Sequence, residues 1–254
     1  MFSFQNKKAV VTGGGSGIGK AIAVALAQKG AEVHILEMDA RRANQTVSEI
    51  TLQGLKAVAH QCNVAIQSEV EQVFEKIGAV HVLVNNAGIA HVGRADNTSE
   101  EDFDRIMNVN VKGVYNCIRA VIPQLRKSNG GVILNMASIA ALVGLADRFA
   151  YSTAKGAVKA MTMSVAKDYL HENIRCISIS PARVHTPFVD GFLVENYGDN
   201  QIEMFEKLSK SQPIGRMANP EEIGYLALYL CSDEASFITG VDYPIDGGFT
   251  TLNN

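Results

Sequence analysis

Tryptophan is absent from the 254-residue sequence, prolines number only six, and the four cysteines form no recognisable pair. Neither a CxxC pair nor another spacing typical of a metal site occurs among them. We therefore expect reduced, mostly buried thiols, as is usual in cytoplasmic proteins, at Cys62, Cys117, Cys176 and Cys231. The six histidines also lack a metal-binding spacing and no HExxH motif is present, so no metal site is predicted.

An excess of one charge is missing too, because 23 basic residues are balanced by 26 acidic ones, for a net charge of −3. No basic block or stripe occurs, which argues against binding to nucleic acid or to an anionic membrane. No run is long and apolar enough to cross a bilayer. The opening residues MFSFQNKKAVVTGGG resemble neither a signal peptide nor a transit peptide, so we predict a cytoplasmic protein.

The sequence does contain a regular alternation of short apolar runs and longer amphipathic segments, in a chain that is 47% apolar. Such alternation predicts an α/β protein with a three-layer Rossmann fold, a doubly wound parallel sheet of about seven strands with helices on both faces. Strands are expected at 8–12, 32–37, 56–62, 80–85, 130–138, 174–180 and 241–248, and helices at 18–28, 40–53, 67–77, 111–126 and 150–171.

No linker, composition shift or repeat divides the chain, so we predict a single domain over residues 1–254. Thr98 and Glu101 fit a capping box before one helix, and Asn219-Pro220 fits the start of another. Residues 181–216 form one long stretch without a regular pattern. They are expected to be a mobile lid, with a fixed helical appendage or a subunit contact as the alternative. The apolar inner face of this lid would comprise Phe188, Phe192, Leu193 and Phe205.

The turn after the first predicted strand is rich in glycine and reads TGGGSGIG. Gly13, Gly17 and Gly19 depart from the G-x-G-x-x-G spacing, but glycine allows a positive φ and a close approach of a ligand to the main chain. The helix that follows would offer its free N–H groups to an anion, which fits the pyrophosphate of a dinucleotide. A tight turn without a ligand is the alternative interpretation.

The second predicted strand ends in an acid, Glu37. A carboxylate at this place accepts hydrogen bonds from the adenosine ribose and repels a 2′-phosphate. Ser16 of the glycine turn is not basic, and Arg41 and Arg42 belong to the next helix. These features favour NAD over NADP, unless Glu37 is a solvated surface charge.

The sequence YSTAK places Tyr151 and Lys155 four residues apart, on the same face of a predicted helix. An ammonium near the phenol favours the phenolate and is expected to lower the pKa of Tyr151, and the positive nicotinamide of NAD⁺ would add to this effect. A tyrosine tuned in this way is a usable general base. Taken alone, such a pair is more typical of a packed aromatic residue beside a solvated lysine.

Further motifs follow the glycine turn along the chain: NNAG at 85–88, NVNVKG at 108–113, NMAS at 135–138, YSTAK at 151–155 and DGG at 246–248. With these motifs in this order and spacing, the whole chain closely resembles the short-chain dehydrogenase/reductase family, in its single-domain, NAD-dependent branch. Two positions depart from the family's pattern. Asn63 replaces the usual aspartate at the adenine, and Ala182 replaces the usual glycine after the sixth strand.

The resemblance implies a site at which Ser138 holds the substrate oxygen and Tyr151 removes its proton while hydride passes to the nicotinamide. It also implies that Lys155 holds the nicotinamide ribose and that Asn110 supports a water that links Lys155 to solvent. The cofactor NAD would contact Gly13, Gly15, Ser16, Gly17, Ile18, Gly19, Glu37, Asn63, Val64, Asn86, Ala87, Gly88, Tyr151, Lys155, Pro181, Val184 and Thr186.

The expected activity is an NAD-dependent interconversion of a secondary alcohol and a ketone. A sugar, sugar acid, polyol or small hydroxy acid is the expected substrate, because Arg148 and Arg183 would flank the pocket together with His91. Alternatively, Arg148 pairs with Asp147 or Asp190 and Arg183 points to solvent. A 3-oxoacyl thioester reductase and a non-catalytic dinucleotide sensor are the other functions considered. The resemblance further implies a homotetramer or dimer.

Overall fold

The computed structural model of the chain describes residues 1–252, without the side chains at positions 188, 192, 195, 196 and 199. Phe188 and Phe192, which were expected to line a lid, are among these, so that expectation lies outside the described residues. No helix in the described part of the chain is both long and apolar enough to span a membrane.

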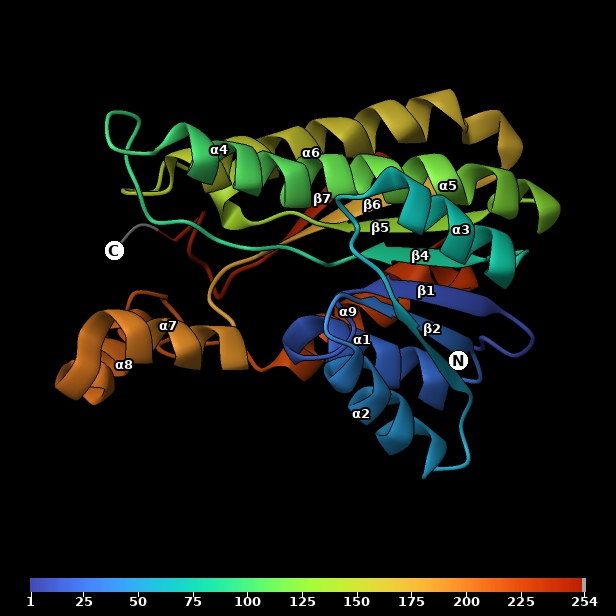
Figure 1. Cartoon of the computed structure of the whole chain (residues 1–254), viewed down its shortest axis with the longest axis horizontal. Coiled ribbons are helices and arrows are strands. Elements are labelled where there is room, and N and C mark those ends of the chain that lie inside the picture. Colours follow the sequence, from blue (N-terminus) through green and yellow to red (C-terminus); the bar gives the residue numbers. More distant parts are fainter. Residues whose placement is uncertain (253–254) are drawn as a thin grey trace.

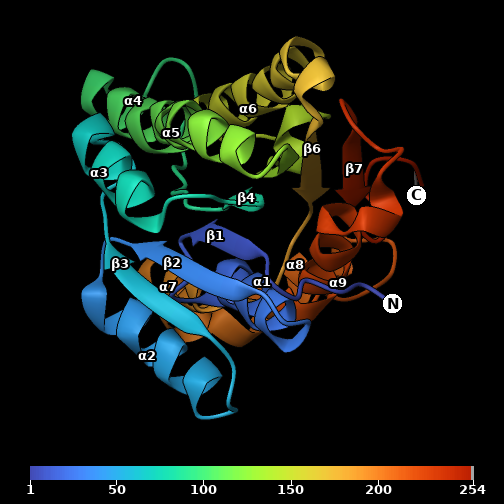
Figure 2. The ribbon, with the colours of Figure 1, turned by 90° about the vertical axis from the view of Figure 1, so that its right-hand side faces the viewer.

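A seven-stranded parallel sheet forms the centre of the molecule, with the strand order β3-β2-β1-β4-β5-β6-β7 (Figures 1 and 2). The strands are β1 (Lys8–Thr12), β2 (Glu32–Glu37), β3 (Ala57–Gln61), β4 (Val82–Asn85), β5 (Gly131–Met136), β6 (Ile174–Pro181) and β7 (Asp242–Ile245). The order reverses between β1 and β4, and open sheets of this kind bind ligands beyond the carboxyl ends of the strands at that point. The predicted fold class is confirmed.

Helices cover both faces of the sheet and bury an apolar core on each side (Figure 2). One face is covered by α1 (Gly17–Gln28), α2 (Ala40–Thr51) and α9 (Pro220–Cys231), and the other by α3 (Gln67–Ile77), α4 (Glu100–Met107), α5 (Gly113–Lys127) and α6 (Phe149–Asp168). A turn of π-helix at Asn108–Lys112 joins α4 to α5. Because π-helical turns often occur at functional sites, this junction is a candidate part of the active site.

Two helix starts were predicted by their caps, and one of them was displaced by a residue. Asn219 is the expected cap of α9, and together with Glu222 it forms a capping box that was not predicted. The cap of α4, however, is Ser99, whose Oγ accepts from the main-chain N–H of Asp102 at 3.1 Å. Thr98 instead donates its hydroxyl to the main-chain oxygen of Arg94 at 2.7 Å.

The stretch 181–216, predicted to be irregular, is largely helical. It contains α7 (Pro187–Tyr197), a short 3-10 turn at Gly198–Asn200 and α8 (Gln201–Lys210), which form a lobe beyond the carboxyl end of the sheet (Figure 1). Gln212 closes the base of this lobe, because its buried side chain accepts from the main-chain N–H of Arg183 at 3.0 Å and donates to the main-chain oxygen of Arg216 at 2.8 Å.

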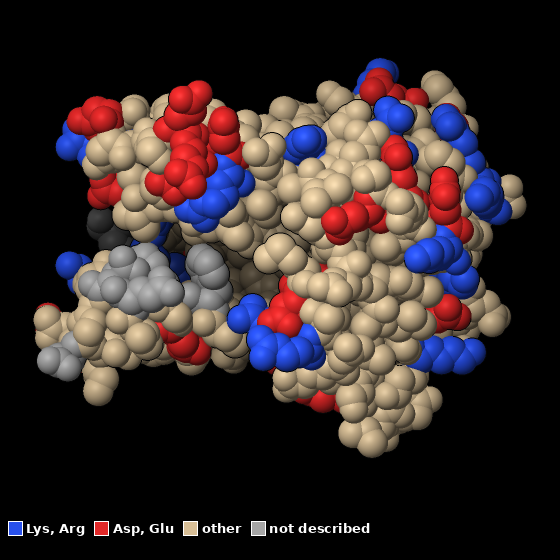
Figure 3. All heavy atoms as spheres, viewed as in Figure 1, with Lys and Arg blue, Asp and Glu red and all other residues tan. Residues whose placement is uncertain are grey.

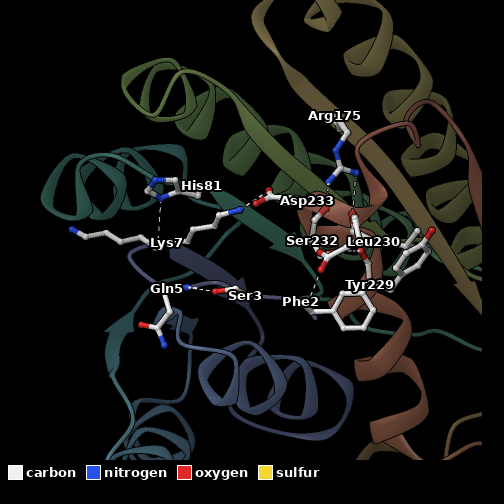
Figure 4. Close-up of polar contacts among 12 residues, drawn as sticks. Phe2, Ser3, Gln5, Lys7, His81, Arg175, Tyr229, Leu230, Ser232 and Asp233 are labelled. Carbon is white, nitrogen blue, oxygen red and sulfur yellow. Dashed lines mark hydrogen bonds and ion pairs between the residues drawn. The ribbon is translucent and has the colours of Figure 1, made fainter.

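At the opposite end of the sheet, polar contacts hold the last turn of α9 in place (Figure 4). The Arg175 guanidinium donates to the main-chain oxygens of Leu230, Ser232 and Ile238, at 2.9, 2.9 and 3.1 Å. A cation at a helix C-terminus complements the helix dipole and pairs carbonyls that have no partner within the helix. The packing of α9 on β6 is thereby fixed far from the carboxyl edge of the sheet.

Candidate active site

Three predicted catalytic side chains meet where β5 ends and α6 begins. Ser138 lies two residues beyond β5 and accepts the main-chain N–H of Ala140 on its Oγ at 3.1 Å. Tyr151 and Lys155 lie one turn apart on α6, with the Lys155 Nζ 5.7 Å from the centre of the Tyr151 ring. That ammonium donates to the main-chain oxygen of Met136 at 2.6 Å, which ties the lysine to the end of the strand.

The electrostatics of these groups differ from the simple expectation. Burial raises the pKa of Tyr151, and the opposing influences are a hydrogen bond from Ser138 and the positive charge of Arg148. Burial also lowers the pKa of Lys155, to about 8. The expectation that Lys155 lowers the pKa of Tyr151 is therefore wrong for the protein's own groups, because the penalty of burying the phenolate exceeds the stabilisation that those groups supply.

Asn110 is buried in the π-helical turn between α4 and α5. Its side-chain amide pairs with the main chain of Ile89, accepting at 2.9 Å and donating at 2.8 Å. These two bonds fix the segment that follows β4. The β-carbon of an alanine in place of Gly88 would lie 3.2 Å from the Asn110 Oδ1, so Asn110 also lies close beside this segment.

The glycine turn has the geometry that a dinucleotide requires. Gly13 and Gly17 adopt φ values of +64° and +51°, and a β-carbon at Gly19 would lie 2.2 Å from the main-chain oxygen of Gly13. Ser16 precedes α1 in extended conformation and makes no side-chain cap, so the first N–H groups of α1, near Ile18, remain available to an anion.

Glu37 lies beside this turn with its carboxylate fixed in place. One oxygen accepts from the main-chain N–H of Gly15 at 3.3 Å, and the other accepts from those of Met38 and Asp39 at 3.0 and 3.3 Å. A β-carbon at Gly15 would come within 3.0 Å of the Glu37 Oε2 and 2.8 Å of the Arg42 β-carbon. The acid thus stands directly over the glycine turn.

The NNAG segment is braced against β1. The Thr12 Oγ1 accepts from the main-chain N–H groups of Asn86 and Ala87, both at 3.0 Å. The Asn86 amide donates in turn to the main-chain oxygens of Thr12 and Gly13, at 3.1 and 3.2 Å. The role of Thr12 was missed in the sequence, although the residue belongs to the glycine motif, because its partners are main-chain groups that follow β4 and are far away along the sequence.

The remaining predicted cofactor residues lie around the same edge of the sheet. Asn63 accepts the main-chain N–H of Ala65 on its Oδ1 at 3.0 Å, and the carbonyl of Val64 accepts from Asn116 at 2.8 Å. On the other side, Pro181 ends β6, Val184 pairs with Ala218, and Thr186 approaches the glycine turn. A β-carbon at Gly17 would lie 3.2 Å from the Thr186 Cγ2.

The predicted substrate residues Arg148, Arg183 and His91 contact different parts of the protein. Arg148 caps the start of α6 and its guanidinium lies 3.5 Å from the main-chain oxygen of His91. Arg183 follows β6 and donates its Nε to the Ser211 Oγ at 3.1 Å. The Nδ1 of His91 lies 3.8 Å from the Asp102 Oδ1 of α4. Among the described residues, no group of three or more His, Cys, Asp or Glu side chains could hold a metal ion.

Known proteins resemble this chain in sequence and in fold. The sequence model of a family described as enoyl-(acyl carrier protein) reductase matches residues 13–250. An uncharacterized oxidoreductase of Thermotoga maritima is 38% identical over 253 residues, which cover 98% of this chain and 100% of that protein. A cyclohexanol dehydrogenase of an Acinetobacter species is 36% identical over 253 residues, covering 98% and 96%. The crystal structure of a 3-ketoacyl-(acyl-carrier-protein) reductase from Brucella melitensis, complexed with NADH, has a TM-score of 0.87 at 34% identity, covering 98% and 100%.

Proposed function

Since the chain belongs to the short-chain dehydrogenase/reductase family, we propose that it is an NAD-dependent enzyme that interconverts a secondary alcohol and a ketone. The observation that carries this proposal is the cluster of Ser138, Tyr151 and Lys155 at the carboxyl edge of the sheet. The tight glycine turn, which would receive a dinucleotide, follows β1 at the point where the strand order reverses, on the same edge of the sheet.

NAD fits the residues that are present. The tight glycine turn would receive its pyrophosphate at the start of α1, and Glu37 would accept hydrogen bonds from the adenosine ribose. The fixed carboxylate would repel the 2′-phosphate of NADP. Bound NAD⁺ would supply the acceptor for the hydride that leaves the alcohol.

The chain's own residues would bind the substrate, accept its proton and hold the nicotinamide ribose. Ser138 would hold the substrate oxygen, and Tyr151 would take the proton from it as general base. Arg148 and the Ser138 hydrogen bond both favour the phenolate form of Tyr151. Lys155, anchored to the Met136 carbonyl, would bind the ribose on the nicotinamide side and place its charge near the phenol. Asn110 would position the segment after β4 and the water that serves Lys155.

For the substrate, we favour a polar compound such as a sugar, sugar acid, polyol or small hydroxy acid. Arg148, whose positive charge acts on Tyr151, and Arg183, which follows β6 at the same edge of the sheet, support this choice. The alternative is a 3-oxoacyl thioester reductase, favoured by the likeness to the Brucella melitensis enzyme. A sensor without chemistry is disfavoured because Asn110, Ser138, Tyr151 and Lys155 are all retained.

The wider proposals concern the protein as a whole. We propose that residues 1–254 form a single domain, that residues 181–216 act as a lid, and that the enzyme is a cytoplasmic homotetramer. The α7–α8 lobe lies beyond the carboxyl edge of the sheet, where a lid would cover the site (Figure 1). Neither nucleic acid nor a membrane is expected as a partner, given a net charge of −3.

A substrate screen tests the activity. Sugars, polyols, hydroxy acids, cyclic alcohols and a 3-hydroxyacyl thioester would each be incubated with NAD⁺ while NADH absorbance is followed. We expect turnover of at least one secondary alcohol. Binding of NAD⁺ without turnover of any compound would support the sensor, and preference for the thioester would support the alternative enzyme.

A further inference from the structure

The α7–α8 lobe is joined to the rest of the molecule by two segments, 182–186 and 211–218, which lie side by side at its base. The main-chain N–H of Ala218 donates to the Arg183 oxygen at 3.0 Å, and the Ala218 oxygen accepts from the His185 N–H at 2.8 Å. Figure 3 shows the surface hollowed between this lobe and the end of the molecule formed by α4 and α6. The two segments therefore form one connection between the lobe and the sheet, which we call the lobe joint.

The lobe joint is attached to the end of β7. The Ala182 N–H donates to the Ile245 oxygen at 3.2 Å, and the Ile214 N–H donates to the Gly247 oxygen at 3.1 Å. Beyond the joint, no residue of α8 is buried. The joint is thus fixed to the sheet, whereas α8 is held by no buried side chain of its own.

Gln212 is buried within the lobe joint, and its side-chain amide bonds to both segments. The Oε1 accepts from the Arg183 N–H at 3.0 Å. The Nε2 donates to the Arg216 oxygen at 2.8 Å and lies 3.4 Å from the Arg183 oxygen. Main-chain groups without a partner are costly away from water, so loss of this amide would loosen the 182–186 segment.

The 182–186 segment also approaches the glycine turn. Thr186 is buried, and a β-carbon at Gly17 would lie 3.2 Å from its Cγ2. Gly17 begins α1 after β1, whereas Glu37 ends β2 and Ser138 follows β5. Because the strand order is β2-β1-β4-β5-β6, the segment lies on the side of the glycine turn that carries Ser138, away from Glu37. It would therefore border the nicotinamide end of a bound dinucleotide and not the adenosine end.

We propose that Gln212 is a positioning residue for the nicotinamide half of the cofactor, and that it acts through the Arg183 N–H on Val184 and Thr186. The inference rests on the proposed function, because NAD is the molecule that this segment would contact. Hydride transfer requires a closely defined placement of the ring, and a displacement of about 1 Å can cost about 100-fold in rate. A buried amide that fixes the bordering segment therefore contributes to the affinity for the ring and to its orientation.

The binding of two nucleotides tests this role without turnover. ADP-ribose contains the adenosine, the pyrophosphate and the second ribose of NADH but lacks the nicotinamide ring. Gln212→Met keeps the length of the side chain and removes both hydrogen-bonding groups. By calorimetric titration we expect its Kd for NADH to rise about 10-fold or more, as expected when buried polar groups lose their partners, while its Kd for ADP-ribose changes by less than about 2-fold.

Gln124→Met is the matched control, because Gln124 is also a buried glutamine. It lies in the last turn of α5, where its main-chain oxygen accepts from the Val80 N–H ahead of β4, at the edge of the sheet opposite the site. A general loss of stability would affect both variants, so the ratio of the two Kd values should change in Gln212→Met alone. The same change of this ratio in Gln124→Met would overturn the proposal.

Hydrogen exchange of the ligand-free protein tests whether Gln212 acts through the 182–186 segment. We expect the Arg183 amide to exchange about 10-fold faster or more in Gln212→Met, because its acceptor is removed, with exchange in β4 unaltered. Gln212→Asn, whose side chain is too short to reach both segments, should show the same changes to a smaller extent, and it replaces the Met variant if that variant does not fold. Unchanged exchange at 182–186 would refute the positioning role.

Failure of the proposed function would give a different result. A wild type that binds neither NADH nor ADP-ribose would contradict the cofactor, and with it this inference. A wild type that binds both, together with an unchanged ratio of Kd values in Gln212→Met, would contradict the role of Gln212 and leave the cofactor in place.

Discussion

At the scale of single residues, burial is the largest influence on the pKa of Tyr151. The phenol is displaced toward its neutral form by burial, and Ser138 and Arg148 oppose this displacement only in part. One of the three N–H groups of the Lys155 ammonium donates to the Met136 carbonyl. The proposed function brings a further positive charge, that of the oxidised nicotinamide, beside the phenol, where it would favour the phenolate.

The substitution Tyr151→Phe removes only the phenolic oxygen. We expect turnover to fall by about 10²- to 10⁴-fold, as for loss of a general base, with NAD⁺ binding nearly unchanged. Steady-state kinetics and calorimetric titration of NAD⁺ would measure the two quantities. Tyr115→Phe is the control, because Tyr115 is 44% exposed on α5. Wild-type turnover of the Tyr151 variant at every pH would show that the tyrosine is structural.

The cofactor preference also belongs to a single residue. Glu37→Ser removes the carboxylate that stands over Gly15 and would repel a 2′-phosphate. We expect kcat/KM for NAD⁺ to fall and that for NADP⁺ to rise, so that the ratio of the two narrows by about 10-fold or more, given a loss of one or two hydrogen bonds to a charged group. Glu32→Ser, at the start of the same strand, should leave the ratio unaltered. A wild-type protein without preference for NAD⁺ would contradict the assignment.

At the scale of elements, the β2–β3 edge carries a histidine pair that makes stability depend on pH. The His34 Nδ1 and His60 Nε2 lie 3.0 Å apart, and the other ring nitrogen of His34 lies 3.1 Å from a Glu32 oxygen. Burial and the charges of His34 and Lys76 lower the pKa of His60 to about 4. Burial is also the main cause of the lowered pKa of His34, with Glu32 opposing it and Lys8 adding to it.

The direction of this pH dependence follows from the difference in the histidine pKa between the folded and the unfolded state. The unfolded chain takes up a proton near pH 6.5, whereas the folded protein resists protonation of His60 until about pH 4. The contribution of His60 to the free energy of unfolding is therefore fully present above pH 6.5, and it is lost as the pH falls from 6.5 toward 4. We expect this loss to be about 1–2 kcal/mol, after allowing for solvent screening of a partly exposed side chain.

Urea unfolding at pH 7, 5.5 and 4.5 would measure the free energy of unfolding of the wild type and of His60→Gln. We expect a smaller loss of stability at low pH in the variant. The comparison cancels the contribution of other acidic groups. His171→Gln, at an exposed turn after α6, is the control and should follow the wild type. Parallel pH curves for all three proteins would contradict the proposed role of the pair.

The α7–α8 lobe is the element most suited to closing over the site. None of the residues of α8, all described, is buried, and Leu193 is the buried side chain among those described in α7. Few apolar contacts imply a low free energy of local opening. We expect hydrogen exchange at 187–210 to slow on addition of NAD⁺ plus substrate, whereas exchange in α3 stays constant. Unchanged exchange in the lobe would favour the fixed appendage instead.

The elements also show what a single sequence can and cannot predict. Apolar runs and the glycine turn predicted the sheet, because parallel strands are buried on both faces and only glycine fits at positions 13, 17 and 19. The helices of 187–210 escaped prediction, since Pro187, Gly191 and Gly198 interrupt the periodic pattern. The predicted cap of α4 was wrong by one residue because Thr98 and Ser99 are adjacent and both belong to the residue types that cap helices. The pKa of Tyr151 depends on burial, which only tertiary packing determines.

At the scale of the whole molecule, the face formed by α5 and α6 is the place where we expect a second copy to bind. The helices lie side by side along one surface (Figure 1), and Tyr115 and Met163 are 44% and 51% exposed there. A shallow hollow of about 360 Å³ between the helices is mostly apolar. It is lined by Tyr115, Ile118, Ala157, Ala160, Met161, Ser164 and Val165. Exposed apolar surface of this kind marks contact sites, and the family's usual assembly predicts a homotetramer.

Ala160→Arg tests this assembly, because it adds a charged, bulky side chain at an exposed position that lines the hollow. Light scattering after gel filtration should give four times the chain mass of 27.3 kDa for the wild type and a smaller multiple for the variant. Ala160→Ser should retain the wild-type mass, and so should Leu52→Arg, which places the same charge just past the end of α2, where Leu52 is 84% exposed. A wild-type mass of one chain would exclude the tetramer. A tetramer that survives Ala160→Arg would show that the subunits associate through another face of the molecule.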